Sequence, residues 1–205
     1  FRSWNNERAI FTRKEEGISD ALGTAVNIQE MVFGNKSERC ATGVFFTRDN
    51  TTGEKHADKL EGTVLFQAQG EDVVAGIRNS LPIEALRDHA DPAFQAIYAE
   101  MKATGDHLET ALRNMQDTEF TVEEQDGKPV LFWLQIRDGK RSAKAESVIA
   151  AAMHEEGVIS KEDAVMMVNP DRFEELLFPQ IEAEARGNAT IIATGSAASP
   201  GASAG

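Results

Sequence analysis

Two β-rich runs separated by a short turn are the feature that most limits how this chain can fold. The first run covers residues 118–124 and alternates Phe120 and Val122 with polar residues, and the second covers 130–137 and is mostly apolar. The turn between them contains Asp126-Gly127, and Asp-Gly between β-rich runs is a strong hairpin signal. We therefore expect an antiparallel hairpin within residues 115–141 that turns near Gly127.

Four polar side chains of this hairpin fall on one face if the turn is centred on Gly127. Successive side chains of a strand point to opposite faces, so Asp117 and Glu119 share a face, as do Gln135 and Arg137. In that register Glu119 lies opposite Gln135, and Asp117 lies opposite Arg137. A shift of one residue would separate them, so the patch depends on the register.

Two carboxylates, an amide and a guanidinium on one patch suit a magnesium ion and a polyphosphate. Mg²⁺ prefers oxygen ligands and is usually held by one or two carboxylates plus substrate phosphates. A planar guanidinium can hold a phosphate through two hydrogen bonds. On spacing alone the solvated face of an ordinary edge hairpin is the favoured interpretation, because alternating polar faces are common in antiparallel sheets. The residues by themselves leave both interpretations open.

The remaining patterns predict an α+β fold with an antiparallel sheet. A helix is expected from Ser3–Asn6 to Gly17, and a long helix starts at the Asp91-Pro92 cap with core residues that include Leu112. Further strands are expected at 24–33, 43–48 and 63–68, with a surface turn at 69–76. After the hairpin, short helices at 143–156, 160–168 and 170–177 form a small bundle, followed by a short strand at 191–193.

The charge balance limits the partners. With 21 Lys+Arg and 34 Asp+Glu the net charge is −13, which disfavours nucleic acid and anionic membranes. A single cysteine, Cys40, excludes an internal disulfide and fits a reducing compartment such as the cytoplasm. No apolar run is long enough to cross a bilayer, and no signal peptide is evident. The sequence starts at Phe1 and ends in SAASPGASAG, and we expect it to be a piece of a longer chain.

Several long motifs give the chain a resemblance to a known family. It resembles the pyruvate, phosphate dikinases in the second half of their N-terminal ATP-grasp domain, and its tail at 198–205 is similar to the start of their swivelling phosphohistidine domain. The motifs that carry the resemblance are Gly23–Lys36, Thr42–Glu54, Ala68–Asn79, Met115–Gln125 and Phe132–Arg141.

The resemblance implies a domain layout and a role for each patch residue. Residues 1–141 would be the C-terminal part of the ATP-grasp domain, 142–187 a helical linker, and 188–205 the start of the phosphohistidine domain. It implies ATP and Mg²⁺ as cofactors. Glu119 and Gln135 would be metal ligands, with Asp117 supporting them and Arg137 holding phosphate. Asp117 and Arg137 would be the catalytic pair.

Three further residues are implied at the nucleotide site. Thr42-Gly43 matches a turn whose backbone approaches the phosphates, and Glu71 matches an acidic nucleotide-site residue. The sequence departs from the family where Cys40-Ala41 replaces Ser-Gly and where Thr63 replaces a glutamate. Ala41 tolerates glycine-only backbone angles poorly, so the phosphate turn is expected to differ.

The implied reaction converts ATP, phosphate and pyruvate to AMP, pyrophosphate and phosphoenolpyruvate. The ATP-grasp domain would phosphorylate a histidine on the swivelling domain of the same full-length chain, which is expected to be a homodimer through a region absent here. The isolated piece is expected to lack turnover. Two alternatives are a water dikinase (phosphoenolpyruvate synthase) fragment and a non-catalytic acidic nucleotide-binding or interaction module.

Overall fold

The computed structural model describes residues 1–74, 79–176, 188–190 and 192–193. Contacts divide the chain into two compact units, Phe1–Met31 and Val32–Gly205, which are described separately. Within the described residues, no helix is both long enough and apolar enough to cross a membrane.

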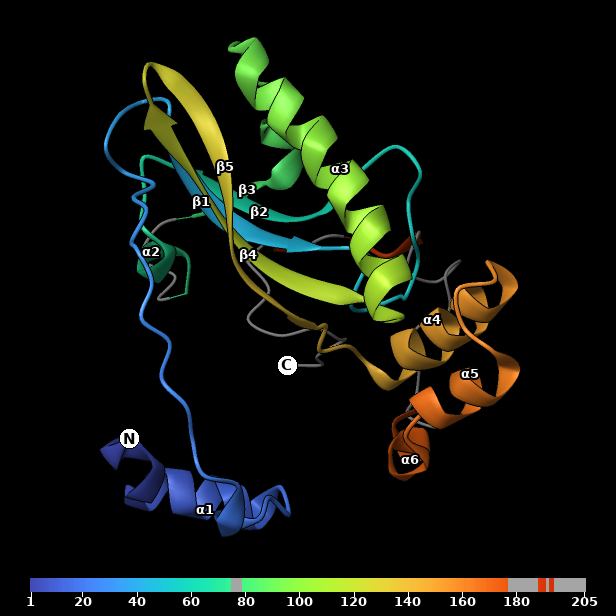
Figure 1. Cartoon of the computed structure of the whole chain (residues 1–205). Helices are drawn as coiled ribbons and strands as arrows, with labels where there is room; N and C mark the ends of the chain where they lie inside the picture. The colour runs from blue at the N-terminus through green and yellow to red at the C-terminus, as the bar shows by residue number, and fades with distance from the viewer. Residues whose placement is uncertain (75–78, 177–187, 191, 194–205) are drawn as a thin grey trace. The chain divides into compact units, whose positions relative to one another are not determined.

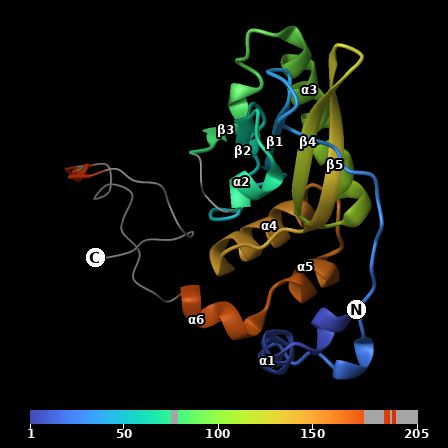
Figure 2. The ribbon, with the colours of Figure 1, turned by 90° about the vertical axis from the view of Figure 1, so that its left-hand side faces the viewer.

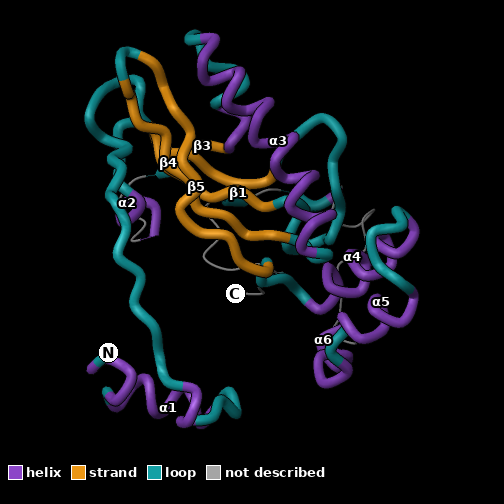
Figure 3. The backbone as a smooth tube through the Cα atoms, in the orientation of Figure 1, coloured by secondary structure: helices purple, strands orange, loops and turns teal. Residues whose placement is uncertain are grey.

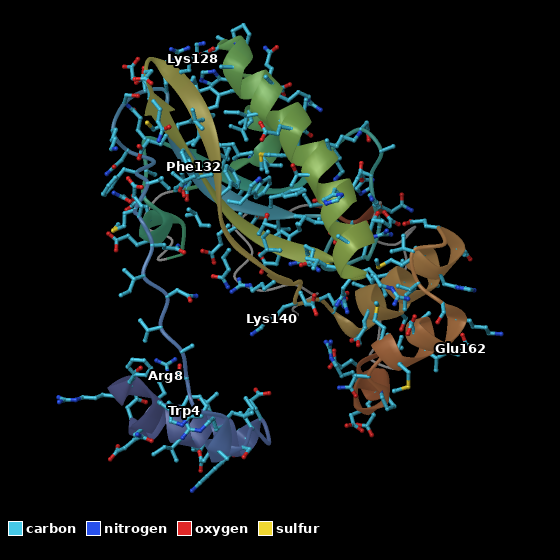
Figure 4. All side chains as sticks on the ribbon, viewed as in Figure 1. Trp4, Arg8, Lys128, Phe132, Lys140 and Glu162 are labelled. Atoms are coloured by element: carbon cyan, nitrogen blue, oxygen red, sulfur yellow. The ribbon has the colours of Figure 1, made fainter. Side chains whose placement is uncertain are left out.

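The first unit is built around one buried arginine. It contains η1 (Arg2–Asn5), α1 (Glu7–Glu15) and η2 (Asp20–Leu22), and the Asn6 side chain caps α1 by accepting from the Ala9 N–H. Arg13 donates to the Asp20 carboxylate and to the Trp4 carbonyl, both at 2.6 Å, and its guanidinium stacks 4.0 Å from the Trp4 ring centroid. Trp4 is labelled in Figure 4. The expected N-terminal helix is therefore confirmed.

The strand expected at 24–33 is wrong. These residues carry no regular secondary structure and appear as loop in Figure 3. Ile28 is 97% exposed and Met31 is 67% exposed, so the apolar alternation has no surface to cover. A strand needs hydrogen bonds from a neighbour, and no described segment supplies them here.

The second unit is an α+β, ATP-grasp-like arrangement, as expected. Within its described residues, five strands form one antiparallel sheet in the order β3-β2-β1-β4-β5 (Figure 1). The strands are β1 (Ala41–Phe46), β2 (Glu61–Phe66), β3 (Leu81–Pro82), β4 (Gln116–Gln125) and β5 (Lys128–Asp138). β4 and β5 are the predicted hairpin.

One face of the sheet is covered by the long helix α3 (Pro92–Leu112), as Figure 1 shows. Asp91 caps the helix by accepting from the Ala93 N–H, with Pro92 in the first turn. The core between α3 and the sheet contains Phe45, Val64, Phe94, Ile97, Met101, Phe120 and Val122. Leu112, expected in this core, is 50% exposed because it lies in the last turn, just before the left-handed Arg113.

Short helices follow the hairpin, as predicted, and pack on its base (Figure 2). They are α4 (Ala143–Glu155), α5 (Lys161–Met167), η4 (Pro170–Arg172) and α6 (Phe173–Leu176). Met115, just before β4, is fully buried with Ile149 and Met153 of α4. Of the strand expected at 191–193, Ile191 lies outside the described residues, and 192–193 have no regular structure. The proposed domain limits at 141 and 187 remain predictions.

Candidate functional site

The hairpin brings the four predicted residues together in the expected register. Asp117 pairs with Arg137, and Glu119 pairs with Gln135. The route to that register differs from the expectation. The turn is a two-residue Asp126-Gly127 turn, with φ of 50° and 75°, and Gln125 pairs with Lys128. Positive φ at both central residues is what the tight right-twisted hairpin turn requires.

A two-residue turn alone would place Glu119 opposite Leu134 and not opposite Gln135. The register shifts between Glu119 and Phe120, because Phe120 pairs with Trp133 while Glu119 pairs with Gln135. Leu134 is the extra residue of a β-bulge on β5. The bulge lets Trp133 pack on the α3 core while Gln135 and Arg137 share the opposite face with Asp117 and Glu119.

Asp117 is the most buried member of this patch. Its side chain is 7% exposed, and its Oδ2 accepts a 2.8 Å hydrogen bond from Arg137 Nε. Its Oδ1 is buried and has no hydrogen-bond partner among the described residues. A buried acceptor without a partner costs free energy comparable to a lost hydrogen bond. The free oxygen therefore marks a position where a cation or donor would be stabilised.

Arg137 and Glu119 complete the charged part of the patch and are more open to solvent. The Arg137 side chain is 48% exposed and that of Glu119 is 35% exposed, with 4.0 Å between Nη2 and Oε1. The hydrogen bond to Asp117 raises the pKa of Arg137 above its ordinary value, so the guanidinium stays charged. With two carboxylates and one guanidinium, the patch carries a net charge of about −1 at neutral pH.

Thr42 and Gly43 lie within strand β1, so the expected phosphate turn is wrong at these positions. Thr42 donates to the Phe120 carbonyl at 3.0 Å and lies 3.2 Å from the Thr121 hydroxyl, two residues along β4 from Glu119. A Cβ on Gly43 would point into the Phe120 ring at 2.8 Å. Gly43 therefore serves packing on the α3 side, and only its backbone is shared with the patch side.

The substitution at Ala41 causes no backbone strain. Ala41 is fully buried at the start of β1 and is absent from the positive-φ residues of the described chain. Its neighbour Cys40 is buried and accepts a 3.3 Å bond from the Glu124 N–H. The altered turn that we expected from the alanine is therefore not seen, because an extended residue needs no glycine.

Glu71 lies on α2 (Gly70–Val74), where the sequence suggested a surface turn. α2 contacts β1, and a Cβ built on Gly70 would lie 4.0 Å from Thr42 Oγ1. Figure 1 shows α2 on the side of the sheet opposite to α3. Glu71 is exposed, and the structure does not bring it into the Asp117 cluster through any hydrogen bond or ion pair of the described residues.

A second buried acid on the same strand face was missed by the sequence analysis. Glu123 is 8% exposed, pairs with Lys36 at 2.9 Å and accepts a 2.5 Å bond from the Phe33 N–H. The bond from Lys36, with that from Phe33, lowers the pKa of Glu123. The strand alternation contained the signal, because Glu123 has the same parity as Asp117 and Glu119.

The sequence analysis also missed a buried ion-pair cluster on the α3 side. Arg48 is 1% exposed and bonds both carboxylate oxygens of Glu109 on α3, at 2.9 and 3.0 Å, and both of Glu156 at the end of α4. It borders a cavity of about 370 Å³ that is also lined by Lys55, Lys102 and Asp106. Lys55 pairs with Asp106 and Glu109, and Lys102 donates to the Ala57 carbonyl, so these three cavity charges already have partners within the protein.

The patch fits a magnesium ion only with help from a ligand. Within the described residues, no three His, Cys, Asp or Glu side chains gather at metal-binding distance. The oxygens available are those of Asp117, Glu119 and the Gln135 amide. One or two carboxylates completed by phosphate oxygens and water are the usual environment of Mg²⁺ in phosphotransferases. The unpartnered Asp117 Oδ1 is the observation that favours a cation there.

Comparison with known proteins finds similarity to dikinases. Residues 1–91 match the family described as pyruvate phosphate dikinase, AMP/ATP-binding domain. The whole chain is 44% identical to pyruvate, phosphate dikinase 1, chloroplastic, of Oryza sativa subsp. japonica and covers 20% of that protein. Identity is 48% to the Rhizobium meliloti (strain 1021) pyruvate, phosphate dikinase and 46% to that of Clostridium symbiosum, with 23% and 22% of those proteins covered.

Over its whole length the chain is similar to pyruvate, phosphate dikinases, and its first 91 residues match the AMP/ATP-binding domain of that family. It spans about a fifth of the length of the curated relatives it matches. The hairpin patch lies outside the 1–91 match but inside the alignment to the pyruvate, phosphate dikinase relatives. The match to an AMP/ATP-binding domain supports ATP binding by this part of the family.

Proposed function

We propose that the hairpin patch is half of a Mg-ATP site that phosphorylates a histidine on another part of the same full-length chain. In this proposal the parent protein converts ATP, phosphate and pyruvate to AMP, pyrophosphate and phosphoenolpyruvate, in a reducing compartment such as the cytoplasm. The observation that carries it is the buried, unpartnered Asp117 Oδ1 beside Arg137 on one face of the sheet. The similarity to pyruvate, phosphate dikinases supports the choice of pyruvate and phosphate over water.

Each residue has a role that follows from its position. Glu119 and Gln135 offer oxygens to the cation from adjacent strands, and Asp117 supplies a buried carboxylate behind them. The bound ion would neutralise charge on the transferred phosphoryl group. Arg137 is exposed enough to reach a phosphate with its two terminal nitrogens. Phosphoryl transfer depends mainly on positioning and charge neutralisation, which these groups can provide.

The electrostatics predict that ATP binds only together with a cation. The patch carries about −1, the chain carries −13, and ATP is itself strongly negative. A free polyphosphate would be repelled, whereas a divalent cation reverses the sign of the local charge. Thr42 and Thr121 offer hydroxyls farther along the same face.

Calorimetric titration of the chain with Mg-ATP tests this function. The decisive variant carries Asp117→Asn and Glu119→Gln, which keep side-chain shape and remove both charges. The matched control is Asp138→Asn, an exposed acid of the same strand pair. We expect the parent and the control to bind and the double variant to lose binding by at least about tenfold, since bonds to charged groups contribute roughly 1.5–3 kcal/mol each.

Equal binding by all three proteins would contradict the site and favour the non-catalytic module. Absence of binding by all three would show that the remainder of the full-length chain is needed for affinity. The single Glu119→Gln change in the full-length protein then decides, because undiminished phosphorylation of the histidine by ATP would overturn the proposed role.

A further inference from the structure

The two oxygens of the Asp117 carboxylate have unequal environments. Oδ2 accepts from Arg137 Nε, whereas Oδ1 is buried without a partner among the described residues. The carboxylate is therefore half satisfied. Arg137 donates to it through one nitrogen, although an arginine can donate to both oxygens of a carboxylate through two nitrogens.

Arg137 holds this position through a limited set of contacts. Within the described residues Nε donates its hydrogen bond to Asp117, and Nη2 is 4.0 Å from Glu119 Oε1, beyond hydrogen-bond range. Its side chain is 48% exposed, whereas that of Asp117 is 7% exposed. The carboxylate is fixed by burial, and the long guanidinium stem is free to turn into solvent.

We propose that Arg137 is an exchangeable counter-ion for Asp117, so that a divalent cation displaces it and releases it toward the polyphosphate. This inference rests on the proposed function and deepens it. In the arrangement described, Arg137 neutralises one of two carboxylate charges. A divalent cation neutralises both, and it also supplies the missing partner of Oδ1. The carboxylate then no longer needs the guanidinium.

The exchange couples the two ligands thermodynamically. Cation binding must break the Arg137–Asp117 bond, which weakens the affinity for the cation alone. When polyphosphate is present, the released guanidinium gains two phosphate hydrogen bonds, which offsets that cost. Each ligand therefore raises the affinity for the other by the same factor.

If Arg137 instead stays bonded to Asp117 when the cation binds, removing it should have the opposite effect on the affinity for the cation. If the guanidinium only oriented Asp117, its removal would loosen the carboxylate and weaken cation binding. If it is exchanged, its removal eliminates a competitor and strengthens cation binding. The sign of the change distinguishes the two roles.

The test measures binding of Mn²⁺ by electron paramagnetic resonance, with and without inorganic tripolyphosphate. The variant is Arg137→Met, which keeps the stem and removes the charge. The matched control is Lys140→Met, three residues farther along at the base of the hairpin, labelled in Figure 4. Lys140 is exposed, so its removal reports the general effect of losing one positive charge near the site.

We expect Arg137→Met to bind Mn²⁺ alone several-fold more tightly than the parent and more tightly than Lys140→Met. We also expect the gain in Mn²⁺ affinity caused by tripolyphosphate, about fivefold or more in the parent, to fall toward one in Arg137→Met. Thermal unfolding of each variant establishes that it is folded.

Two results overturn the inference in different ways. If Mn²⁺ affinity in Arg137→Met is unchanged or reduced while the parent still binds Mn²⁺ with tripolyphosphate, the exchange is wrong and the proposed site stands. If the parent binds no Mn²⁺ under either condition, no cation displaces Arg137 in this half-site and the exchange is wrong, while the proposed site is then decided by Glu119→Gln in the full-length protein.

Discussion

At the scale of single residues, the patch depends on small side chains of β1 that let this strand pack closely against β4. Gly43 leaves space for the Phe120 ring, and Thr42 beside it donates to the Phe120 carbonyl. These contacts hold β4 along the edge that faces β1, whereas Arg137 lies on β5 along its other edge. The position of Asp117 and Glu119 is therefore set partly by atoms that touch no ligand.

Gly43→Ala is expected to destabilise the fold through overpacking. The added methyl would clash with the Thr63 carbonyl and lie 2.8 Å from the Phe120 ring, so the free energy of unfolding should fall by about 3 kcal/mol. Gly70→Ala is the matched control, because its nearest atom is 4.0 Å away and the residue is helical. Urea unfolding of both variants measures the difference. Equal midpoints would contradict the packing role of Gly43.

Glu123 is expected to contribute a pH-dependent part of the stability. The bonds from Lys36 and the Phe33 N–H lower its pKa below the ordinary 4.5. The unfolded chain is therefore protonated first as the pH falls. The contribution is complete above about pH 5 and is lost as the pH drops through the lowered folded value.

Urea unfolding of the parent chain and of Glu123→Gln between pH 7 and pH 3 measures this contribution. The difference in stability between the two proteins should be largest near neutral pH and shrink in acid. Glu124→Gln is a control on the neighbouring residue, which faces the other side of the strand. A difference that grows in acid would contradict the assignment.

At the scale of elements, the sequence predicted what strand alternation and turn chemistry control. Asp126-Gly127 located the hairpin, and parity placed Asp117 and Glu119 on one face. Centring the turn on Gly127 gave their correct pairing with Arg137 and Gln135 only because the bulge adds one residue. The bulge could not be predicted, because Phe132-Trp133-Leu134 is an unbroken apolar run that shows no change of phase. Packing of Trp133 on the core decides where the extra residue lies.

The wrong or missed features share one cause, which is that a local sequence pattern does not show the tertiary contacts that a segment makes. A β-type pattern at 24–33 does not reveal whether a partner strand is available, and these residues lack one in the described chain. Thr42-Gly43 was assigned to a turn by resemblance to the family, but the pair lies in β1, where close packing requires the glycine. The Arg48 cluster was not foreseen, because residues 48, 109 and 156 are brought together only by tertiary structure.

The buried Arg48–Glu109 ion pair should contribute more to stability than the neighbouring, more exposed Lys55–Asp106 pair. Glu109→Gln leaves the buried Arg48 without its buried counter-charge, with only the 41% exposed Glu156 remaining, and should cost about 3 kcal/mol or more. Asp106→Asn removes the other partner of Lys55 at a position that is 56% exposed, and should cost less than about 1 kcal/mol. Chemical denaturation compares the two. Similar losses would contradict the importance of burial.

At the scale of the whole molecule, the chain consists of two units joined by residues without secondary structure. The sheet, α3 and the short helices belong to the unit that starts at Val32. The Phe33 N–H already bonds Glu123 in that unit. The first 31 residues therefore contribute no strand to the sheet that carries the patch.

Limited thermolysin digestion should cut within residues 24–31 before it cuts within the strands β1 to β5 or α3. Ile28 is 97% exposed in a segment without regular secondary structure, which a protease can bind, whereas strands and α3 must open first. Mass spectrometry identifies the cut, and Ile28→Ser should slow it. The product should keep the circular dichroism of the sheet. Earlier cleavage within β4 or β5 would contradict this organisation.

The bulge at Leu134 has a practical consequence for spectroscopy. It separates the hairpin into a tip, paired from Gln125 with Lys128, and a base that carries Asp117 and Arg137. Lys128 is exposed at the tip, nine residues and about 30 Å along the strand from Arg137. A spin label at Lys128 would leave the register of the base unchanged. Its dipolar distance to Mn²⁺ at the base would then follow the twist of the hairpin as nucleotide binds.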